Sequence, residues 1–331
     1  MQSKTPSVAS GAFGSEFETT FGLHRPKLLR HCYRMLGSFA DAEDLVQESL
    51  LRAWRARNTY NADAPLINWL MRIATNACLS HLRQKGPRHL PQLDSAAAEP
   101  RDAYVSLEVA HWVTPAPDDA VFVGPEDALE SRETVALAFV ALLQRLPPWQ
   151  RAVLILTDVM GWSAAEIATT LGHTLPSVTS ALHRARDTMS KAPKEPLHQA
   201  EPEAVREYLR CWEERDLDGL LARMHADICF SMPPYATWFF GIGAVREFLK
   251  GEIFAPFWAR GLAARPVHAN GQPAAVWYVP IEGLWRPHSI QVVHFEGARA
   301  KHVINFIGEA YLAGFRLPTE VAREDVGLSP A

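Results

Sequence analysis

Long apolar runs and a secretion signal are both missing from this 331-residue sequence. No stretch approaches the about 20 apolar residues needed to cross a bilayer, and the first residues, MQSKTPSVASGAFGSEFE, lack a basic start followed by an apolar core. We therefore expect a cytoplasmic protein with no membrane partner. Cysteine is scarce too, and without a C-x-x-C pair it gives no sign of a disulfide framework or a zinc site. The four cysteines, Cys32, Cys78, Cys211 and Cys229, are predicted to be free and buried.

An excess of positive charge is missing as well, because 33 Lys and Arg face 37 Asp and Glu, giving a net charge of -4. A protein that holds nucleic acid alone is usually basic overall. Basic residues nevertheless cluster at 72–88, without an acid, and at 184–194, with Asp187 as the one acid. The clusters are Arg72, Arg83, Lys85 and Arg88, and Arg184, Arg186, Lys191 and Lys194. They predict contacts with phosphates but a weak independent hold on DNA.

Composition divides the chain into blocks. Residues 17–86 have helical periodicity, whereas residues 87–132, rich in Pro, Ala and acid, predict an extended linker. A second helical block covers 133–193, and residues 200–320 carry helix signals followed by strand signals. Two apolar stripes mark the first block: Leu28, Leu29, Cys32, Met35 and Leu36, and Leu45, Val46, Leu50, Leu51 and Trp54. We predict two all-α domains followed by an α+β domain.

The strand signals of the last block are ICFSM, AARPVHA, PAAVWYVPI, LWRPHSIQVVHFE and AKHVINFIG. The turn pairs Asn270-Gly271, Glu282-Gly283 and Glu296-Gly297 lie between the later segments and favour tight hairpins. Because the helix signals come first, we expect helices packed on a curved antiparallel sheet.

The stretch GWSAAEIATTLGHTLPSVTSALHRAR predicts a helix-turn-helix. Ser163 and Glu166 form a capping box for one helix, and Gly172 can take the left-handed conformation that ends it. Thr174 can cap a second helix, with Pro176 in its first turn, where a missing N–H costs nothing. The same pattern also fits a plain helical hairpin with a solvated polar face.

The segments CYRMLGSFADAEDLVQESLLRAWRA, LINWLMRIATNACLSHLRQK and LQRLPPWQRAVLILTDVMGWSAAEIATTLGHTLPSVTSALHRARDTM decide between these readings. They resemble regions 2 and 4 of bacterial RNA polymerase sigma factors of the extracytoplasmic-function (ECF) type. The sequence also resembles the subgroup with a cone-shaped C-terminal domain similar to SnoaL and nuclear transport factor 2. The linker motif WVTPAPDD is similar to one found in that subgroup.

The resemblance implies binding to the RNA polymerase core (its beta-prime and beta subunits) and to promoter DNA. The implied core-polymerase-binding residues are Asp41, Glu43, Asp44, Gln47 and Glu48, whose acidic face suits a basic partner. An acidic first helical turn can also serve only to stabilise the helix dipole. The residues expected to read and melt the downstream promoter element are Asn58, Tyr60, Asn61, Asp63, Trp69, Arg72, Asn76, His81 and Arg83. Trp54 and Trp69 fit a core role equally well.

In the helix-turn-helix, the polar face of the second helix is expected to read the upstream promoter element in the major groove. Its residues are Thr174, Ser177, Thr179, Ser180, His183, Arg184 and Arg186. The linker is expected to run through the polymerase toward the RNA exit path. The polymerase core would supply most of the affinity, which fits the modest basic charge of the chain.

The C-terminal domain offers polar candidates for a small-molecule pocket. They are His225, Asp227, Trp238, Tyr278, Gln291, His294 and Asn305, with Asn270, Gln272 and His288 as further candidates. The segment AKHVINFIG has no carboxylate where cyclase-like relatives often keep their acid, and no nucleophile motif or cofactor signal is present. We therefore predict a promoter-specificity factor without enzyme activity, modulated in cis by its last domain. The alternative is fusion to an active isomerase-like or cyclase-like domain, or to a ligand-sensing one.

Overall fold

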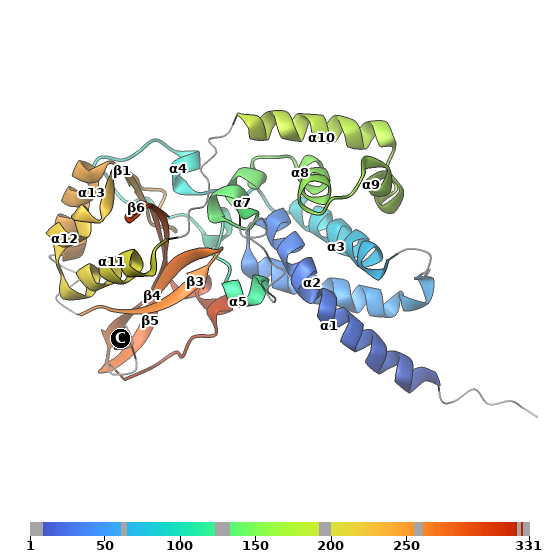
Figure 1. The fold of residues 1–331 in the computed structure, drawn as a ribbon, viewed down its shortest axis with the longest axis horizontal. Coiled ribbons are helices and arrows are strands. Elements are labelled where there is room, and N and C mark those ends of the chain that lie inside the picture. Colours follow the sequence, from blue (N-terminus) through green and yellow to red (C-terminus); the bar gives the residue numbers. More distant parts are fainter. Residues whose placement is uncertain are drawn as a thin grey trace, which may run out of the picture.

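A computed structural model describes residues 9–60, 65–122, 133–191, 200–254, 261–322 and 326. Within these ranges the side chains are described from residue 22 onward, apart from Asp94. None of the described helices is both long and apolar enough to span a bilayer. Figure 1 shows two halves, with the helical regions on one side and the sheet with its covering helices on the other.

The first helical region is a packed group of helices. Its elements are α1 (Ala9–Leu36), α2 (Phe39–Arg55), the 3-10 turn η1 (Arg57–Thr59) and α3 (Leu66–Leu82). Gly37 has a φ of 67° and ends α1, and the Ser38 hydroxyl then caps α2 by accepting from the Asp41 N–H at 3.2 Å. The first predicted stripe is fully buried, from Leu28 to Leu36. The second is buried only at its start, because Leu51 and Trp54 point to solvent.

The described part of the linker, residues 87–122, is packed, which corrects the expectation of an extended spacer there. It contains α4 (Pro91–Asp94), the 3-10 turn η2 (Val109–His111) and α5 (Asp118–Val121). Trp112 and Val113 are completely buried, and the Trp112 indole N–H donates to the Pro234 carbonyl in the last domain at 3.1 Å. The apolar residues scattered among its prolines bury surface between the two halves, which a solvated tether could not do.

The second helical region contains the predicted helix-turn-helix. Its elements are α7 (Leu137–Gln144), α8 (Pro148–Leu154), the π-helical turn η3 (Ile155–Val159), α9 (Ala164–Leu171) and α10 (Leu175–Ser190). The Ser163–Glu166 capping box is present, and Gly172 ends α9 at a φ of 71°. The Thr174 hydroxyl accepts from the Ser177 N–H at the start of α10. The local signals of this stretch are therefore confirmed.

The last domain is α+β, as predicted, but its sheet is mixed. Its helical elements are α11 (Pro202–Glu214), α12 (Leu217–Ala222), α13 (Ile242–Phe248) and the π-helical turn η4 (Leu249–Phe254). Its strands are β1 (Met224–Ser231), β2 (Trp238–Phe240), β3 (Ala263–Ala269), β4 (Gln272–Ile281), β5 (Leu284–Glu296) and β6 (Arg299–Ile307), in the order β2-β1-β6-β5-β4-β3. Strands β3 to β6 form the expected antiparallel meander, whereas β1 joins β6 in parallel. The hairpin signals did not predict this parallel pairing, because it joins segments distant in sequence.

The two faces of the sheet bury different partners. One face packs on α11, α12 and α13 through residues such as Trp277 and Phe295. The opposite face, which includes Val276, Ile290 and Phe306, joins one continuous apolar cluster with both helical regions and the linker. After β6 the chain forms the 3-10 turns η6 (Glu309–Tyr311) and η7 (Ala313–Phe315), and the latter approaches the start of α2. The last domain is thus docked on the helical half by its sheet.

Candidate functional site

The outer face of α2 is exposed to solvent in the described part of the chain. Its exposed stripe consists of Asp44, Gln47, Leu51 and Trp54, which recur every three or four residues. Glu43 and Glu48 are half-buried and form ion pairs with Arg25 at 2.9 Å and Arg52 at 2.6 Å. The stripe therefore combines acid, amide and apolar groups on one exposed helix face, a mixture complementary in charge to a basic surface.

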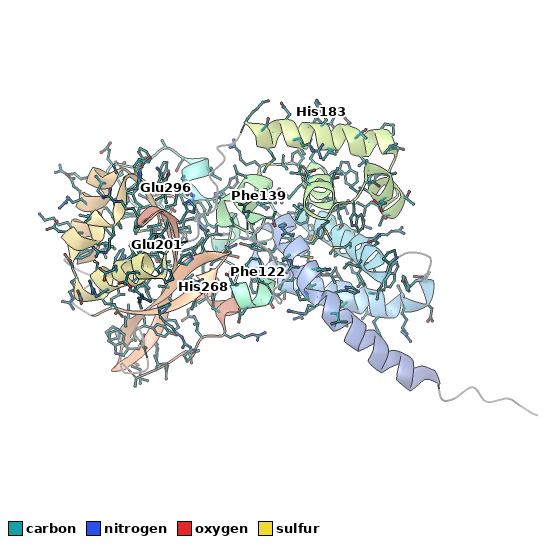
Figure 2. All side chains as sticks on the ribbon, in the orientation of Figure 1. Phe122, Phe139, His183, Glu201, His268 and Glu296 are labelled. Carbon is teal, nitrogen blue, oxygen red and sulfur yellow. The ribbon has the colours of Figure 1, made fainter. Side chains whose placement is uncertain are left out.

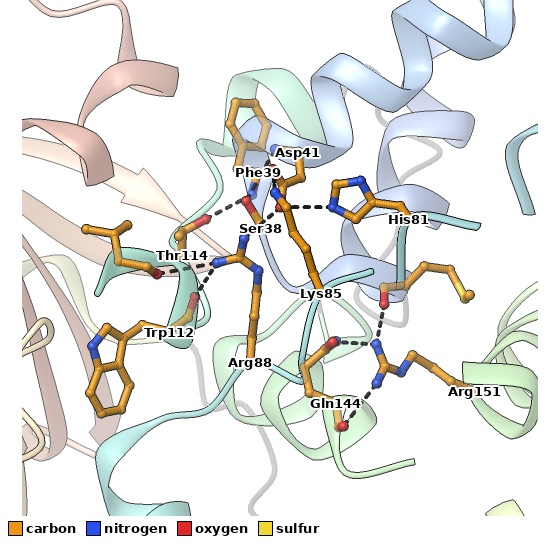
Figure 3. A network of polar contacts seen from close by, with 12 residues as sticks. Ser38, Phe39, Asp41, His81, Lys85, Arg88, Trp112, Thr114, Gln144 and Arg151 are labelled. Carbon is orange, nitrogen blue, oxygen red and sulfur yellow. Dashed lines mark hydrogen bonds and ion pairs between the residues drawn. The ribbon is translucent and has the colours of Figure 1, made fainter. Parts of the chain in front are cut away.

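Asp41, also predicted to bind the polymerase core, lies apart from this exposed stripe and is paired within the chain. Its carboxylate lies 2.6 Å from the Arg88 guanidinium, 3.3 Å from the Lys85 ammonium and 3.4 Å from the His81 ring (Figure 3). Burial by itself raises the pKa of Asp41, but Arg88 and Lys85 outweigh burial and hold this pKa below its usual value. Arg88 also donates to the Trp112 carbonyl at 3.0 Å. Asp41 thus ties α2 to the linker, and His81 faces Asp41 rather than solvent.

The residues predicted to melt the promoter are partly exposed and partly packed. The rings of Tyr60 and Trp69 are in contact, with centroids 5.5 Å apart, although Trp69 also packs against the core. The exposed members are Asn58, Arg72, Asn76 and Arg83. Asn61 and Asp63 lie outside the described residues. Near this surface, Arg57 stacks over the Trp54 ring, with its guanidinium carbon 4.4 Å from the centroid.

The polar face of α10 is accessible at the outer edge of the molecule, where Figure 2 labels His183. The exposed predicted residues are Thr174, Thr179, Ser180, His183, Arg184 and Arg186, while Ser177 is half-buried. Val178, Ala181 and Ala185 form the opposite, buried face. The separation of a polar face from a small-residue face suits a helix that is held by α8 and α9 and open toward a groove.

Two polar side chains of the second helical region cap the C-terminal end of α1. Arg151 is almost fully buried and donates to the Met35 carbonyl and, within its own region, to the Gln144 side chain at 2.5 Å (Figure 3). The Gln144 amide donates to the Arg34 carbonyl at 3.1 Å. Carbonyls at a helix end need such donors, and the helix dipole favours a cation there. Neither residue was predicted from the sequence, although a charged residue inside the apolar stretch of α8 could have indicated a buried partner.

Asn270 connects the last domain to the same end of α1. Its amide nitrogen donates to the Tyr33 hydroxyl oxygen at 2.8 Å and to the Val135 carbonyl at 2.6 Å, and its amide oxygen accepts from the Ala116 N–H at 2.8 Å. Asn270 is completely buried and was predicted only as a turn residue and a pocket candidate. This contact could not be found from the sequence, because its partners are more than a hundred residues away.

The predicted pocket residues of the last domain lie on different parts of the sheet. His225 and Asp227 lie at the surface, and the Lys301 ammonium is 2.6 Å from the Asp227 carboxylate. Hydrogen bonds from Lys301 and His225 lower the pKa of Asp227 to about 2. The Trp238 indole donates to the Ser95 carbonyl in the linker at 3.0 Å.

The remaining pocket candidates divide between the two faces of the sheet. Tyr278 belongs to the face that packs on the helical half. His294 lies 3.3 Å from Gln272, and burial lowers the pKa of His288. Gln291 instead accepts from the Tyr208 hydroxyl of α11 at 3.0 Å, and Asn305 is its register partner on β6. Gln291 and Asn305 are therefore the candidates that turn toward the covering helices.

Comparison with known proteins decides the family. Residues 20–88 match Sigma-70 region 2, residues 136–189 match Sigma-70 region 4, and residues 205–301 match the SnoaL-like domain. The chain is 37% identical over 308 residues to the ECF RNA polymerase sigma factor SigG of Mycobacterium tuberculosis, covering 89% of this chain and 82% of that protein. The chain belongs to the ECF sigma factors. This ECF sigma factor is thus a transcription initiation factor that gives RNA polymerase promoter specificity, and not an enzyme.

Other relatives agree with this assignment. The probable ECF sigma factor SigI of M. tuberculosis is 28% identical over 263 residues, covering 77% of this chain and 82% of that protein. The crystal structure of the ECF sigma factor SigJ of M. tuberculosis has a TM-score of 0.59 at 21% identity, and the match covers 91% of this chain and all of that one. The fold of this ECF sigma factor, two helical regions plus a SnoaL-like domain, therefore recurs in an experimental structure.

Proposed function

We propose that this sigma factor uses three separate surfaces during initiation, acting in the cytoplasm where RNA polymerase is found. The stripe of Asp44, Gln47 and Leu51 on α2 binds the polymerase core. The Tyr60–Trp69 pair and the exposed face of α3 read and open the downstream promoter element. The polar face of α10 reads the upstream element in the major groove. Each of the three surfaces has exposed members among the described residues, which supports these assignments.

The SnoaL-like domain acts in this proposal as a restraint that holds regions 2 and 4 together. The observation that carries it is the Asn270 side chain, which bonds at once to Tyr33 of region 2, Ala116 of the linker and Val135 at the entry to region 4. A fully satisfied buried amide fixes the relative positions of the groups that it joins. One residue of the last domain therefore bridges both promoter-reading regions.

Separation of the two regions is expected when the sigma factor occupies a promoter. In the free chain α9 packs against α3, and α7 and α8 share an apolar cluster with region 2. On B-DNA, two major-groove sites that are one helical turn apart are separated by about 34 Å, and each further turn adds the same distance. Both regions cannot stay in contact and also occupy two separated elements, so the closed arrangement opposes promoter binding until the polymerase core opens it.

The restraint can be tested in the full chain by replacing Asn270→Ala. We expect a longer distance between labels placed at the exposed residues Gln84, beyond α3, and Ala165, in α9, and more run-off transcription at limiting polymerase core. His268→Ala is the matched control, because His268 lies nearby on β3 and is exposed. An unchanged distance together with unchanged transcription in the Asn270→Ala chain refutes the restraint. Deletion of the whole domain is a poorer test, because it exposes the apolar residues of the helical regions and the linker that pack on the sheet.

The three surfaces are tested separately. Gln47→Ala is expected to weaken capture of the chain by immobilised polymerase core, with Gln84→Ala as a control. Arg184→Ala should weaken promoter binding broadly, whereas Ser177→Ala or Ser180→Ala should change base preference in footprints. Unchanged footprints in all three α10 variants would contradict the assignment of α10.

A ligand-sensing role for the SnoaL-like domain is the second candidate. The observation in its favour is the side chain oxygen of Asn305, which is buried without a hydrogen-bond partner beside the Gln291 strand position. A small polar molecule reaching this side of the sheet would satisfy it. Asn305→Leu should then abolish any thermal stabilisation of the chain by a screened metabolite; stabilisation that persists in this variant would exclude Asn305 as a contact.

A further inference from the structure

The π-helical turn η3 places an acidic residue beside the DNA-reading helix. Ile155 and Leu156, which begin the turn, are completely buried, and Leu156 shares an apolar cluster with Val178 of α10. Asp158, two residues later, is exposed. A π-helical turn inserts an extra residue and re-aims the side chains that follow, and such turns are frequent at functional sites. The buried start of the turn fixes the position from which Asp158 reaches α10.

The Asp158 carboxylate accepts two hydrogen bonds from the Arg186 guanidinium of α10. The Arg186 Nη2 lies 2.5 Å from Oδ1, and Nε lies 3.2 Å from Oδ2. A two-point carboxylate–guanidinium contact fixes the plane of the guanidinium as well as its position. The contact uses the Nε–H and one Nη2–H, so the remaining N–H groups are free to bind another acceptor. The Arg186 side chain keeps 56% of its surface exposed, which leaves room for that acceptor.

Arg186 lies on the accessible side of α10. Thr179, His183 and Arg186 are spaced by four and three residues and therefore share one side of the helix. An unpaired acid in this place would repel the DNA backbone. Asp158 instead forms an ion pair with Arg186, which offsets its negative charge. A DNA phosphate can therefore approach Arg186 without net repulsion from Asp158.

We propose that Asp158 is a positioning residue, which holds the Arg186 guanidinium in the orientation that binds a backbone phosphate beside the groove. The inference rests on the proposed function of α10 as the DNA-reading helix. It is separate from that function, since α10 could read DNA with a freely rotating Arg186. Removing the Asp158 carboxylate distinguishes a positioning role from a purely electrostatic effect. If Asp158 orients Arg186, its removal weakens DNA binding. If only its negative charge matters, its removal strengthens DNA binding.

The test uses holoenzyme assembled from polymerase core and the full-length chain. Its probe is a DNA duplex selected from a randomised pool by the wild-type holoenzyme. Asp158→Asn removes the charge and keeps the size of the side chain. We expect its dissociation constant to rise about two- to fivefold, the range that corresponds to an exposed ion pair. Asp187→Asn is the matched control, because Asp187 is an exposed acid on α10 that pairs with Lys191 at 2.7 Å and not with Arg186; its binding should stay equal or become slightly tighter.

A double substitution separates positioning from a general structural effect. In an Arg186→Ala chain, adding Asp158→Asn should no longer weaken binding, because the group to be oriented is gone. If Asp158→Asn binds as tightly as Asp187→Asn, or if it weakens the Arg186→Ala chain as much as the wild type, the positioning role is wrong. If Arg184→Ala and Arg186→Ala both bind like the wild type, the assignment of α10 itself fails, which is a distinguishable result.

Discussion

The amide nitrogen of Asn270 lies 2.8 Å from the hydroxyl oxygen of Tyr33, although the two residues belong to the two opposite halves of the molecule. The Tyr33 hydroxyl in turn donates to the Thr114 carbonyl of the linker at 2.7 Å. Burial raises the pKa of Tyr33 well above its usual value, so this hydroxyl stays protonated and keeps its role as a donor. The last domain, the linker and region 2 therefore share one buried hydrogen-bonded chain.

Replacing Asn270→Ala is expected to lower the free energy of unfolding by about 1–3 kcal/mol, because the buried Ala116 N–H and Val135 carbonyl lose their partner. Urea denaturation of the full chain measures this loss of unfolding free energy. The residue has a φ of 58°, a left-handed conformation that Asn tolerates better than Ala, so Asn270→Gly serves as the control for backbone strain. If both variants lose less than a few tenths of a kcal/mol of unfolding free energy, the hydrogen bonds of the Asn270 side chain contribute little to stability.

Replacing Gly314→Ala is expected to disturb the contact between the C-terminal segment and α2. A Cβ at this position would lie 2.5 Å from the Phe39 ring and 3.4 Å from Pro117. Such overpacking typically costs about 1–3 kcal/mol, measurable by thermal unfolding. Gly243→Ala is the control, since nothing lies within 4 Å of its added Cβ and it stands inside α13. Equal stability of the two variants would contradict the close packing at Phe39.

Replacing Asp41→Asn should destabilise the chain at neutral pH but progressively less in acid. The pKa of Asp41 is lower in the folded chain than in the unfolded one, so its charged form adds stability above the unfolded value of about 3.9. That contribution is lost as the pH falls through the folded pKa. Unfolding measured at pH 7 and near pH 3 should show a difference between wild type and variant that shrinks at the lower pH; a constant difference would mean that the ion pairs with Arg88 and Lys85 do not stabilise the fold.

Replacing Arg151→Met should cost about 3–5 kcal/mol, because several carbonyls at the contact of regions 2 and 4 lose their donor. Burial lowers the pKa of Arg151 to about 10, so the group is still charged at neutral pH. Arg151→Lys keeps the charge but not the forked geometry, and we expect an intermediate loss in denaturant unfolding. If Lys restores full stability, charge alone accounts for the interaction.

Local sequence signals predicted the elements whose causes are local. The Ser163–Glu166 capping box, the Gly172 helix end and the Asn270-Gly271 turn all appear in the structure. Each depends on residues at most a few positions apart, which a single sequence displays directly. The family resemblance then supplied the function, because it rested on long motifs in a fixed order.

Distant neighbours add contacts that the site predictions did not include. Asp41, predicted to bind a partner protein, pairs with Arg88 of the linker. Trp238, predicted to line a pocket, donates a hydrogen bond to the Ser95 carbonyl of the linker. The role of a polar side chain is set by which charged or hydrogen-bonding groups packing brings beside it, and the sequence order of this chain gave no direct sign of those groups.

The sequence by itself determined the two helical regions, the helix-turn-helix and the class of the last domain, since periodicity, caps and turns act over a few residues. Only the tertiary structure decided that residues 87–122 of the linker are packed, that β1 pairs in parallel with β6, and that Asn270, Gln144 and Arg151 gather at one end of α1. These features are contacts between segments far apart in the sequence: the sheet buries one face against the helical half, and the second helical region packs on the end of α1. The free energy of that burial depends on the shape of both surfaces, which exists only once both halves have folded.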